Sequence, residues 1–346
     1  MKKSIFVIVG IALIAALNSV SSCKKDGGGN NTVDTTLHLT PDTIYSPPHF
    51  PKPIIPADNQ PFKEREALGR KLFYDSMVLN GTNSCGGCHD PSAGFSNLNM
   101  KEGKPVLPHS NLAWYSNFLW DGSQKGTLED LALFEISVDH NVDLSLFNNN
   151  ATYKQLFKTA FGVDNITYKE MSYALAQFMR TLVSKNTRYE EVKMRGNGTF
   201  TADEQAGYNI FFTEKGDCFH CHINPIFTDD QLHNTGLDTF YTLRVDRGYF
   251  NISGDSTDMG KFRTPNLRNV ATRKFFMHDG RFTTLEQVVD FYDHGMHKVS
   301  NLDPIMALPY KANGLHLTTD EKRQLIAFLN TLTDSTFLNN PAYGRP

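Results

Sequence analysis

Two copies of one five-residue pattern constrain this chain more than any other feature. The first copy occupies residues 85–89 (CGGCH) and the second residues 218–222 (CFHCH). Both follow the order Cys-x-x-Cys-His, which attaches a c-type haem. The thiols form thioethers with the porphyrin, and the histidine ligates the iron from the proximal side. The sequence therefore predicts two covalently bound c-type haems, held by Cys85, Cys88, His89, Cys218, Cys221 and His222.

Two other kinds of site use a Cys-x-x-Cys pair, namely zinc sites and redox-active dithiols. A zinc site built from two such pairs usually has them closer in sequence than Cys88 and Cys218. A redox dithiol does not need the histidine that directly follows both pairs here. The repetition of the full pattern therefore favours haem attachment over either alternative.

The N-terminus has the pattern of an export signal that ends at a cysteine. Two lysines precede an apolar stretch, residues 5–17, that is too short to cross a bilayer. Small residues then lead to Cys23, which lies outside both haem motifs, in an order that resembles a bacterial lipobox. We expect residues 1–22 to be a lipoprotein signal peptide and Cys23 to hold the protein to a membrane by lipid alone, in the periplasm or cell envelope. An ordinary secretory signal is the alternative, and it also exports the chain.

The composition separates a tether from a folded part. Residues 23–60 are rich in Gly, Asn, Thr and Pro, which is typical of a flexible linker that stiffens toward its end. With 40% hydrophobic residues overall, the remaining chain is long enough to bury a core. The formal net charge of −3 does not indicate a nucleic-acid partner.

Helix signals dominate the folded part. Capping-box spacings, which mark helix starts, begin at Thr167, Thr201, Thr284 and Thr318. Apolar residues follow two of these starts at helical spacing, and strand signals are weak and scattered. We therefore predict an all-α protein with one haem domain over residues 61–197 and a second over residues 198–346.

Six further stretches occur in a definite order along the folded part. They are LGRKLF (68–73), NLAW (111–114), LWDG (119–122), IFTD (226–229), FRTPNLRNV (262–270) and MHDGR (277–281). In order and spacing they resemble the bacterial di-haem cytochrome c peroxidase family, including its MauG-like branch. The resemblance implies two cytochrome c-like domains packed against each other, with the haems near their interface. It also implies that Trp120 helps electrons pass between the haems, although core packing is an alternative role.

The resemblance implies a function as well as a fold. We expect an exported di-haem oxidoreductase that reduces hydrogen peroxide at the N-terminal haem, with electrons relayed by the C-terminal haem. The electron donor would be a small redox protein, either a cytochrome c or a cupredoxin. One alternative is a MauG-like oxidase that acts on a protein or small-molecule substrate. Another is a non-enzymatic di-haem electron carrier.

The second axial ligand of the C-terminal haem distinguishes the branches of this family. Where the peroxidases have methionine, this chain has Tyr292, as the MauG-like branch does. Helical spacing from Leu285 through Val288 and Val289 also points this tyrosine inward. The resemblance therefore implies Tyr292 as the ligand, with three rivals in the same segment: Met277, His294 and Met296. A tyrosinate favours oxidised iron, whereas a thioether raises the potential.

The chain departs from the family at the acid–base position. Aligned with one inserted residue after Trp120, Asn141 takes the place of the family's catalytic Glu, and Glu135 takes that of a Pro. An asparagine side chain cannot shuttle a proton. Asp139 or His140 could take over the proton transfer, but the sequence is also consistent with both being ordinary loop residues. The sequence alone therefore does not imply fast peroxide turnover.

Other departures concern the iron and calcium ligands. The distal histidine of the peroxidases corresponds to Asn97 in this chain. This implies a five-coordinate N-terminal iron unless another side chain ligates it. The candidates for such a ligand are Met100, His109 and His140. The calcium-binding Asn of the family corresponds to Pro105, so calcium is not expected here. Guanidinium groups suit haem propionates, and the candidates are Arg247, Arg263 and Arg268.

Overall fold

The structure, a computed structural model, describes residues 37–44, 46–100, 104–311 and 314–346. Residues 37–346 belong to one compact unit. The predicted signal peptide, Cys23 and the first part of the predicted tether lie outside the described residues. No helix in the described ranges is long and apolar enough to cross a membrane.

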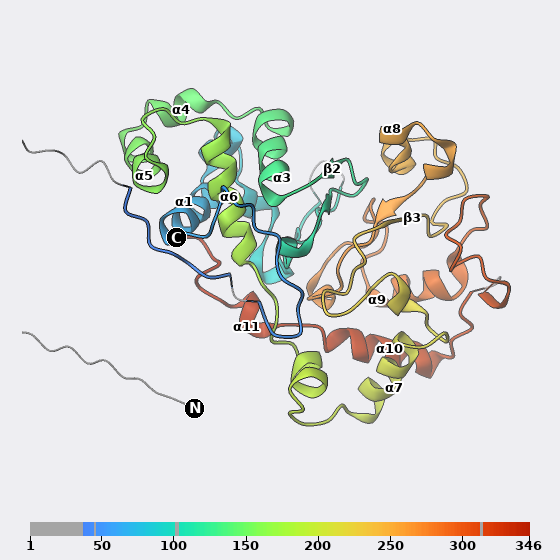
Figure 1. Cartoon of the computed structure of the whole chain (residues 1–346). Helices are drawn as coiled ribbons and strands as arrows, with labels where there is room; N and C mark the ends of the chain where they lie inside the picture. The colour runs from blue at the N-terminus through green and yellow to red at the C-terminus, as the bar shows by residue number, and fades with distance from the viewer. Residues whose placement is uncertain (1–36, 45, 101–103, 312–313) are drawn as a thin grey trace, which may run out of the picture. The chain divides into compact units, whose positions relative to one another are not determined.

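The predicted all-α fold is confirmed (Figure 1). The α-helices are α1 (Lys63–Tyr74), α2 (Cys85–Cys88), α3 (Leu128–Phe134), α4 (Leu144–Asn148), α5 (Ala151–Phe161), α6 (Tyr168–Thr181), α7 (Ala202–Phe211), α8 (Phe250–Ser253), α9 (Leu285–Asp290), α10 (Thr319–Asn330) and α11 (Ser335–Leu338). The strands form two short antiparallel pairs, β1 (Asn117–Phe118) with β2 (Gln124–Lys125), and β3 (Leu232–His233) with β4 (Phe262–Arg263).

Shorter helical turns connect these elements. The 3₁₀ turns are η1 (Ser76–Leu79), η2 (Pro91–Ala93), η3 (Leu112–Trp114), η6 (Cys218–His220), η7 (Arg244–Arg247), η8 (Ser256–Asp258), η9 (Val270–Thr272) and η11 (Pro309–Lys311). Three π-helical turns are η4 (Glu135–Asp139), η5 (Glu190–Met194) and η10 (Phe291–Gly295). Two of them, η4 and η10, directly extend α3 and α9, and both carry residues of the candidate sites.

Capping boxes start the helices that the sequence pattern marked. In each box the threonine side chain accepts from the backbone of the third helical residue, whose side chain accepts in return from the threonine backbone. The four predicted boxes are present, at Thr167, Thr201, Thr284 and Thr318. A fifth box at Thr127 starts α3. These local bonds fix where the helices begin, and therefore where their buried faces point.

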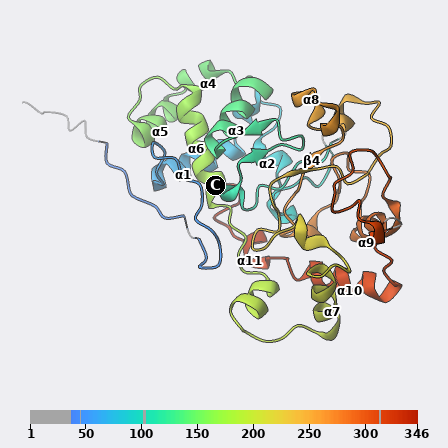
Figure 2. The same ribbon diagram turned by 45° about the vertical axis from the view of Figure 1, so that its right-hand side comes forward.

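Two hydrophobic cores underlie the fold, one around each haem motif. The first core gathers side chains of α1, α3, α5 and α6, and the second gathers side chains of α7, α9 and α10. Figure 2 shows the second group from another side, with α7 and α10 running beside each other. The boundary predicted between residues 197 and 198 stays a prediction.

The chain crosses back to the first core at its C-terminal end. Phe337, Leu338 and Tyr343 pack into the first core. Leu332, which comes shortly before them in the sequence, still belongs to the second core. The Arg70 guanidinium donates from Nε to the Gly344 carbonyl (2.9 Å) and from Nη2 to the Pro341 carbonyl (2.7 Å). The last residues of the chain therefore help to build the first half.

Both halves contain the same helix crossing, and each crossing depends on a glycine. In the first half α1 packs against α6, and a Cβ on Gly69 would lie 1.9 Å from the Ala174 carbonyl oxygen. In the second half α7 packs against α10, and a Cβ on Gly207 would lie 1.9 Å from the Gln324 carbonyl oxygen. Only glycine permits this backbone approach. The haem motif follows the first helix of each pair, so the crossing positions the haem ligands.

Candidate haem sites

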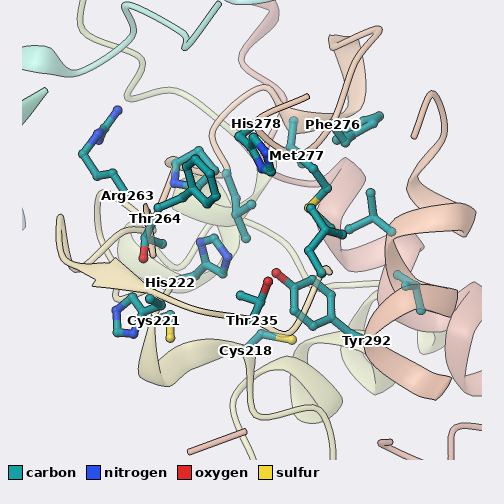
Figure 3. Close-up of a pocket in the computed structure, with 18 of the residues that line it drawn as sticks. Cys218, Cys221, His222, Thr235, Arg263, Thr264, Phe276, Met277, His278 and Tyr292 are labelled. Atoms are coloured by element: carbon teal, nitrogen blue, oxygen red, sulfur yellow. The ribbon is translucent and has the colours of Figure 1, made fainter. Parts of the chain in front are cut away.

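The second haem motif lines a deep pocket (Figure 3). Cys218, Cys221 and His222 form part of its wall, and neither cysteine is in a disulfide. The remaining wall is mainly apolar and includes Phe211, Leu267, Val270, Leu285, Val288, Val289, Leu325 and Leu329. Burial raises the pKa of the Cys218 thiol to about 12. Two thiols and an imidazole in an apolar pocket fit a covalently attached haem.

The two motif histidines are held in the same way. The Nδ1 group of His222 donates to the Phe227 carbonyl (3.1 Å), and that of His89 donates to the Phe95 carbonyl (2.9 Å). Each bond favours the tautomer that carries its proton on Nδ1, and in this tautomer Nε2 has the lone pair that can bind a metal. Burial lowers the pKa of both imidazoles to about 4, so both are neutral near pH 7. Both rings are therefore in the state that metal ligation requires.

Tyr292 lies in η10 and reaches the same pocket as His222. Figure 3 shows its hydroxyl directed into the pocket on the side of the His222 ring. Burial raises the pKa of Tyr292, so ligation would require a metal to displace the hydroxyl proton. Among the rivals, Met277 also lines this pocket, whereas His294 lines a different one and Met296 lines neither. Ligation by Tyr292 stays a prediction, and its position in the pocket supports it.

Arg273, which was not among the predicted propionate ligands, has a guanidinium that is only partly satisfied, because its Nη2 donates to the carbonyls of Asn266 (2.7 Å) and Arg268 (2.9 Å). Arg273 lines the pocket, and its buried Nε has no partner. Burial lowers its pKa to about 10. Arg268 instead pairs with Glu190 in full burial, and Arg263 lines the pocket but pairs with Asp230 at 3.4 Å. A haem propionate would satisfy Arg273, because guanidinium groups bind carboxylates well.

The first haem motif has a second imidazole stacked on its ligand. The rings of His89 and His109 lie 3.5 Å apart between centroids, with 24° between their planes. The buried Nδ1 of His109 has no partner. Ligands in trans point at each other through the iron, and two rings in face-to-face contact do not. The structure therefore places His109 against the proximal ligand, and its role as a ligand of the iron stays a prediction.

A carboxyl group near the first motif comes from Glu135, at the start of η4. The pKa of the Cys85 thiol is raised to about 12, mainly by burial and secondly by the charge of Glu135. Burial, with a smaller effect of Asp139, raises the pKa of Glu135 itself to about 7. His140 lies 3.6 Å from Glu135, between Nε2 and Oε2, and 3.5 Å from the Asp139 carboxylate. Asn141 is exposed, and its predicted catalytic place stays a prediction.

A loop of the first half connects the two motifs. Trp120 lines the second pocket, and its indole Nε1 donates to the Pro105 carbonyl (2.9 Å). Leu107 and Pro108 line the same pocket, and the next residue, His109, stacks on His89. The loop therefore runs from the first proximal ligand to the second pocket. The role of Trp120 as an electron relay stays a prediction that this placement supports.

Comparisons with known proteins identify the family to which this chain is similar. A sequence profile described as di-haem cytochrome c peroxidase matches residues 63–199. The methylamine utilization protein MauG of Methylorubrum extorquens is 32% identical over 345 residues, covering 94% of each chain. The cytochrome-c peroxidase IdrP2 of Denitromonas iodatirespirans is 31% identical over 308 residues, covering 77% of this chain and 80% of that protein.

A solved structure is similar over most of the chain. The crystal structure of a MauG-like protein associated with microbial copper homeostasis has a TM-score of 0.77 and 30% identity, covering 87% of this chain and 98% of that one. The diheme peroxidase BthA of Burkholderia thailandensis E264, with a TM-score of 0.59 and 19% identity, shares the fold. Two c-type haems are the cofactors that this family implies. The chain belongs to the di-haem cytochrome c peroxidase and MauG family of oxidoreductases.

Proposed function

We propose that this protein is an exported di-haem oxidoreductase that reduces hydrogen peroxide at the haem of His89. Electrons come from a small redox protein, a cytochrome c or a cupredoxin, and pass through the haem of His222. The observation that carries the proposal is the placement of Glu135, which puts a carboxyl group close to Cys85 although the aligned position holds Asn141. When bound, the haems supply the redox chemistry at the O–O bond.

The side chains around the first motif suit proton transfer. The Glu135 carboxyl, with its pKa raised to about 7 by burial, accepts the proton from the inner peroxide oxygen and returns it to the outer one. Reduction of the second oxygen to water takes the two electrons from the donor and two further protons, which enter from solvent past the more exposed His140 and Asp139. The bond from His89 to the Phe95 carbonyl orients the imidazole and increases its basicity as a ligand. Trp120 and the loop to His109 occupy the route between the sites.

The second candidate is MauG-like oxidation of a protein or small molecule, and Tyr292 favours it. A tyrosine oxygen reaches the pocket of His222, and an anionic oxygen ligand stabilises oxidised iron. Such a haem would store oxidising equivalents rather than deliver electrons readily. If the protein is such an oxidase, its partner is the protein or small molecule that it oxidises, in place of an electron donor.

The location of the protein is also part of the proposal. The basic and apolar segments before Cys23 support export and lipid attachment, which place the enzyme in the periplasm or cell envelope. Attachment of c-type haem outside the cytoplasm is consistent with this location.

Turnover and spectra of the purified di-haem protein test the proposal. We expect steady consumption of peroxide when a reduced cytochrome c or cupredoxin is supplied, together with one high-spin ferric haem in EPR spectra. A peroxide product that persists for minutes, combined with slow donor oxidation, would favour the MauG-like alternative. Two low-spin haems that do not react with peroxide would reject both enzymes and leave an electron carrier.

A further inference from the structure

We propose that Asp229, His233 and Asp303 form a partly buried charged cluster that lowers the reduction potential of the haem attached at Cys221. The inference rests on the proposed function, since it requires a redox-active haem at the second motif. It assigns these three residues a positioning role, because they act through charge and do not touch the reacting atoms.

The cluster is defined by two short contacts to one imidazole. His233 lies in β3, its Nδ1 is 2.6 Å from Asp303 Oδ2, and its Nε2 is 2.7 Å from Asp229 Oδ2. Carboxylate oxygens only accept hydrogen bonds, so both ring nitrogens must donate. An imidazole that donates from both nitrogens carries a positive charge. The geometry therefore indicates an imidazolium between two carboxylates.

Both carboxylates are fixed by the backbone. The Asp229 Oδ1 accepts from the Gln231 amide (3.0 Å), and the Asp303 Oδ1 accepts from the Ile305 amide (2.9 Å). Burial acts to lower the pKa of His233, whereas the bonds to Asp229 and Asp303, followed by a contribution from Cys221, raise it above its usual value. The exposed fractions of the three side chains are 17% for His233, 11% for Asp229 and 13% for Asp303. The charges are therefore only weakly screened by water.

The cluster lies at the haem attachment point. The Cys221 sulfur, an Asp229 oxygen and a His233 nitrogen all lie within 4.8 Å of one another. His233 and Asp303 also line the pocket of His222 and Tyr292. A sulfur bonded to the porphyrin is unavailable for a metal ion, so the neighbouring charges act on the haem itself.

The net charge gives the direction of the effect. Two carboxylates and one imidazolium sum to one negative charge next to the thioether. The nearby Arg263 is paired with Asp230, and Arg273 is the arginine that suits a propionate. A negative charge at a mostly covered position stabilises the more positive iron, because Coulomb interactions are stronger there than between groups fully surrounded by water. The cluster therefore acts in the same direction as an oxygen ligand at Tyr292, toward oxidised iron.

Potentiometric titration of the complete di-haem protein tests this inference. Asp303→Asn keeps the shape of the side chain and removes one negative charge. We expect the oxidised-to-reduced ratio of one haem to fall about tenfold at a fixed potential, which is a rise of about 59 mV in its midpoint. The midpoint of the other haem should not move. Asp303→Glu keeps the negative charge, so the midpoint potential of this haem should stay at the value of the unsubstituted protein.

Controls separate this effect from misfolding and from the proposed function. Asp203→Asn removes an equal charge from an exposed ion pair with Arg323 in the same half and should leave both midpoints unchanged. If mass spectrometry shows that the Asp303→Asn variant has lost a haem, Asp229→Asn replaces it as the test variant. Attached haems with unchanged midpoints in the aspartate variant would overturn the inference. The titration needs no peroxide, so absent turnover would reject the proposed function without affecting this result.

Discussion

Glu135 is the side chain on which peroxide chemistry should depend most directly. Replacing it with glutamine keeps its size but removes its ability to take up a proton. We expect Glu135→Gln to slow peroxide turnover roughly 100-fold, the lower range for loss of a general acid–base group. Stopped-flow measurement of donor oxidation provides the rate. Glu286→Gln is the matched control, because it makes the same exchange at an exposed position of α9 and should change the rate less than about twofold.

The same group should set the pH dependence of the reaction. With the pKa of Glu135 raised to about 7 by burial, the carboxyl is protonated below this pH and ionised above it. Only the ionised form can accept the first proton from peroxide, so kcat/KM should rise as the pH increases through about 7. The rise should be absent in Glu135→Gln. A rise that persists in the variant would assign the titration to another group.

Tyr292 gives a spectroscopic prediction at the residue scale. In Tyr292→Phe the second pocket loses its phenolic oxygen but keeps the ring. If the oxygen ligates iron, the EPR signal of one ferric haem should change and its midpoint potential should rise, because an anionic ligand has been removed. Met296→Leu is the control and should leave the spectrum unchanged, since Met296 does not line the pocket. Unchanged signals in Tyr292→Phe would remove this residue from the iron.

At the scale of elements, the two helix crossings should be equally intolerant of a side chain. Gly69→Ala and Gly207→Ala each bring a methyl group against a backbone carbonyl that cannot move alone. We expect each to lower the free energy of unfolding by about 1–3 kcal/mol, as overpacking does. Chemical denaturation checks the change. Gln155→Ala, on the exposed face of α5, is the control and should cost less than about 0.5 kcal/mol.

How much of these elements the sequence could predict depends on how local their causes are. The boxes at Thr167 and Thr318 rest on side chains three residues apart, so they were predictable. The inward position of Tyr292 was predictable from helical spacing, although α9 ends at Asp290 and a π-helical turn continues it. The haem motifs were predictable because their chemistry is contained in five residues.

The missed site residues depend on contacts that are distant in sequence. Arg273 lines the second pocket because the chain after β4 folds over it, and no local pattern shows this. Alignment selected Asn141 as the catalytic position, whereas Glu135, at the start of η4, is the carboxyl group whose charge acts on Cys85. The pairing of His233 with Asp303 joins residues 70 positions apart. Such proximity comes from tertiary packing, which the spacing of residues does not encode.

At the scale of the whole molecule, the C-terminal segment should stabilise the first half. Deletion of residues 341–346 removes two Arg70 hydrogen bonds, the bond from the Tyr74 hydroxyl to the Tyr343 carbonyl, and the packing of Tyr343. We expect a loss of about 2–4 kcal/mol from bonds of roughly 1 kcal/mol each and a buried aromatic ring. Hydrogen exchange should accelerate in α1 and α6 but not in α7 and α10.

A shorter deletion is the control for this prediction. Removing only residues 345–346 keeps Tyr343 and the Gly344 carbonyl, so exchange in α1 should stay close to that of the full chain. Equal acceleration in both halves after the longer deletion would contradict the assignment of the tail to the first core.

The return of the chain to its first core also sets an order for biosynthesis. A domain built only from consecutive residues can finish folding while the ribosome is still making the next one. Here Phe337 and Tyr343, which help to complete the first core, are synthesised only after the helices of the second core. The earlier half must wait for the later one, so a nascent chain interrupted before Leu332 yields neither core in finished form.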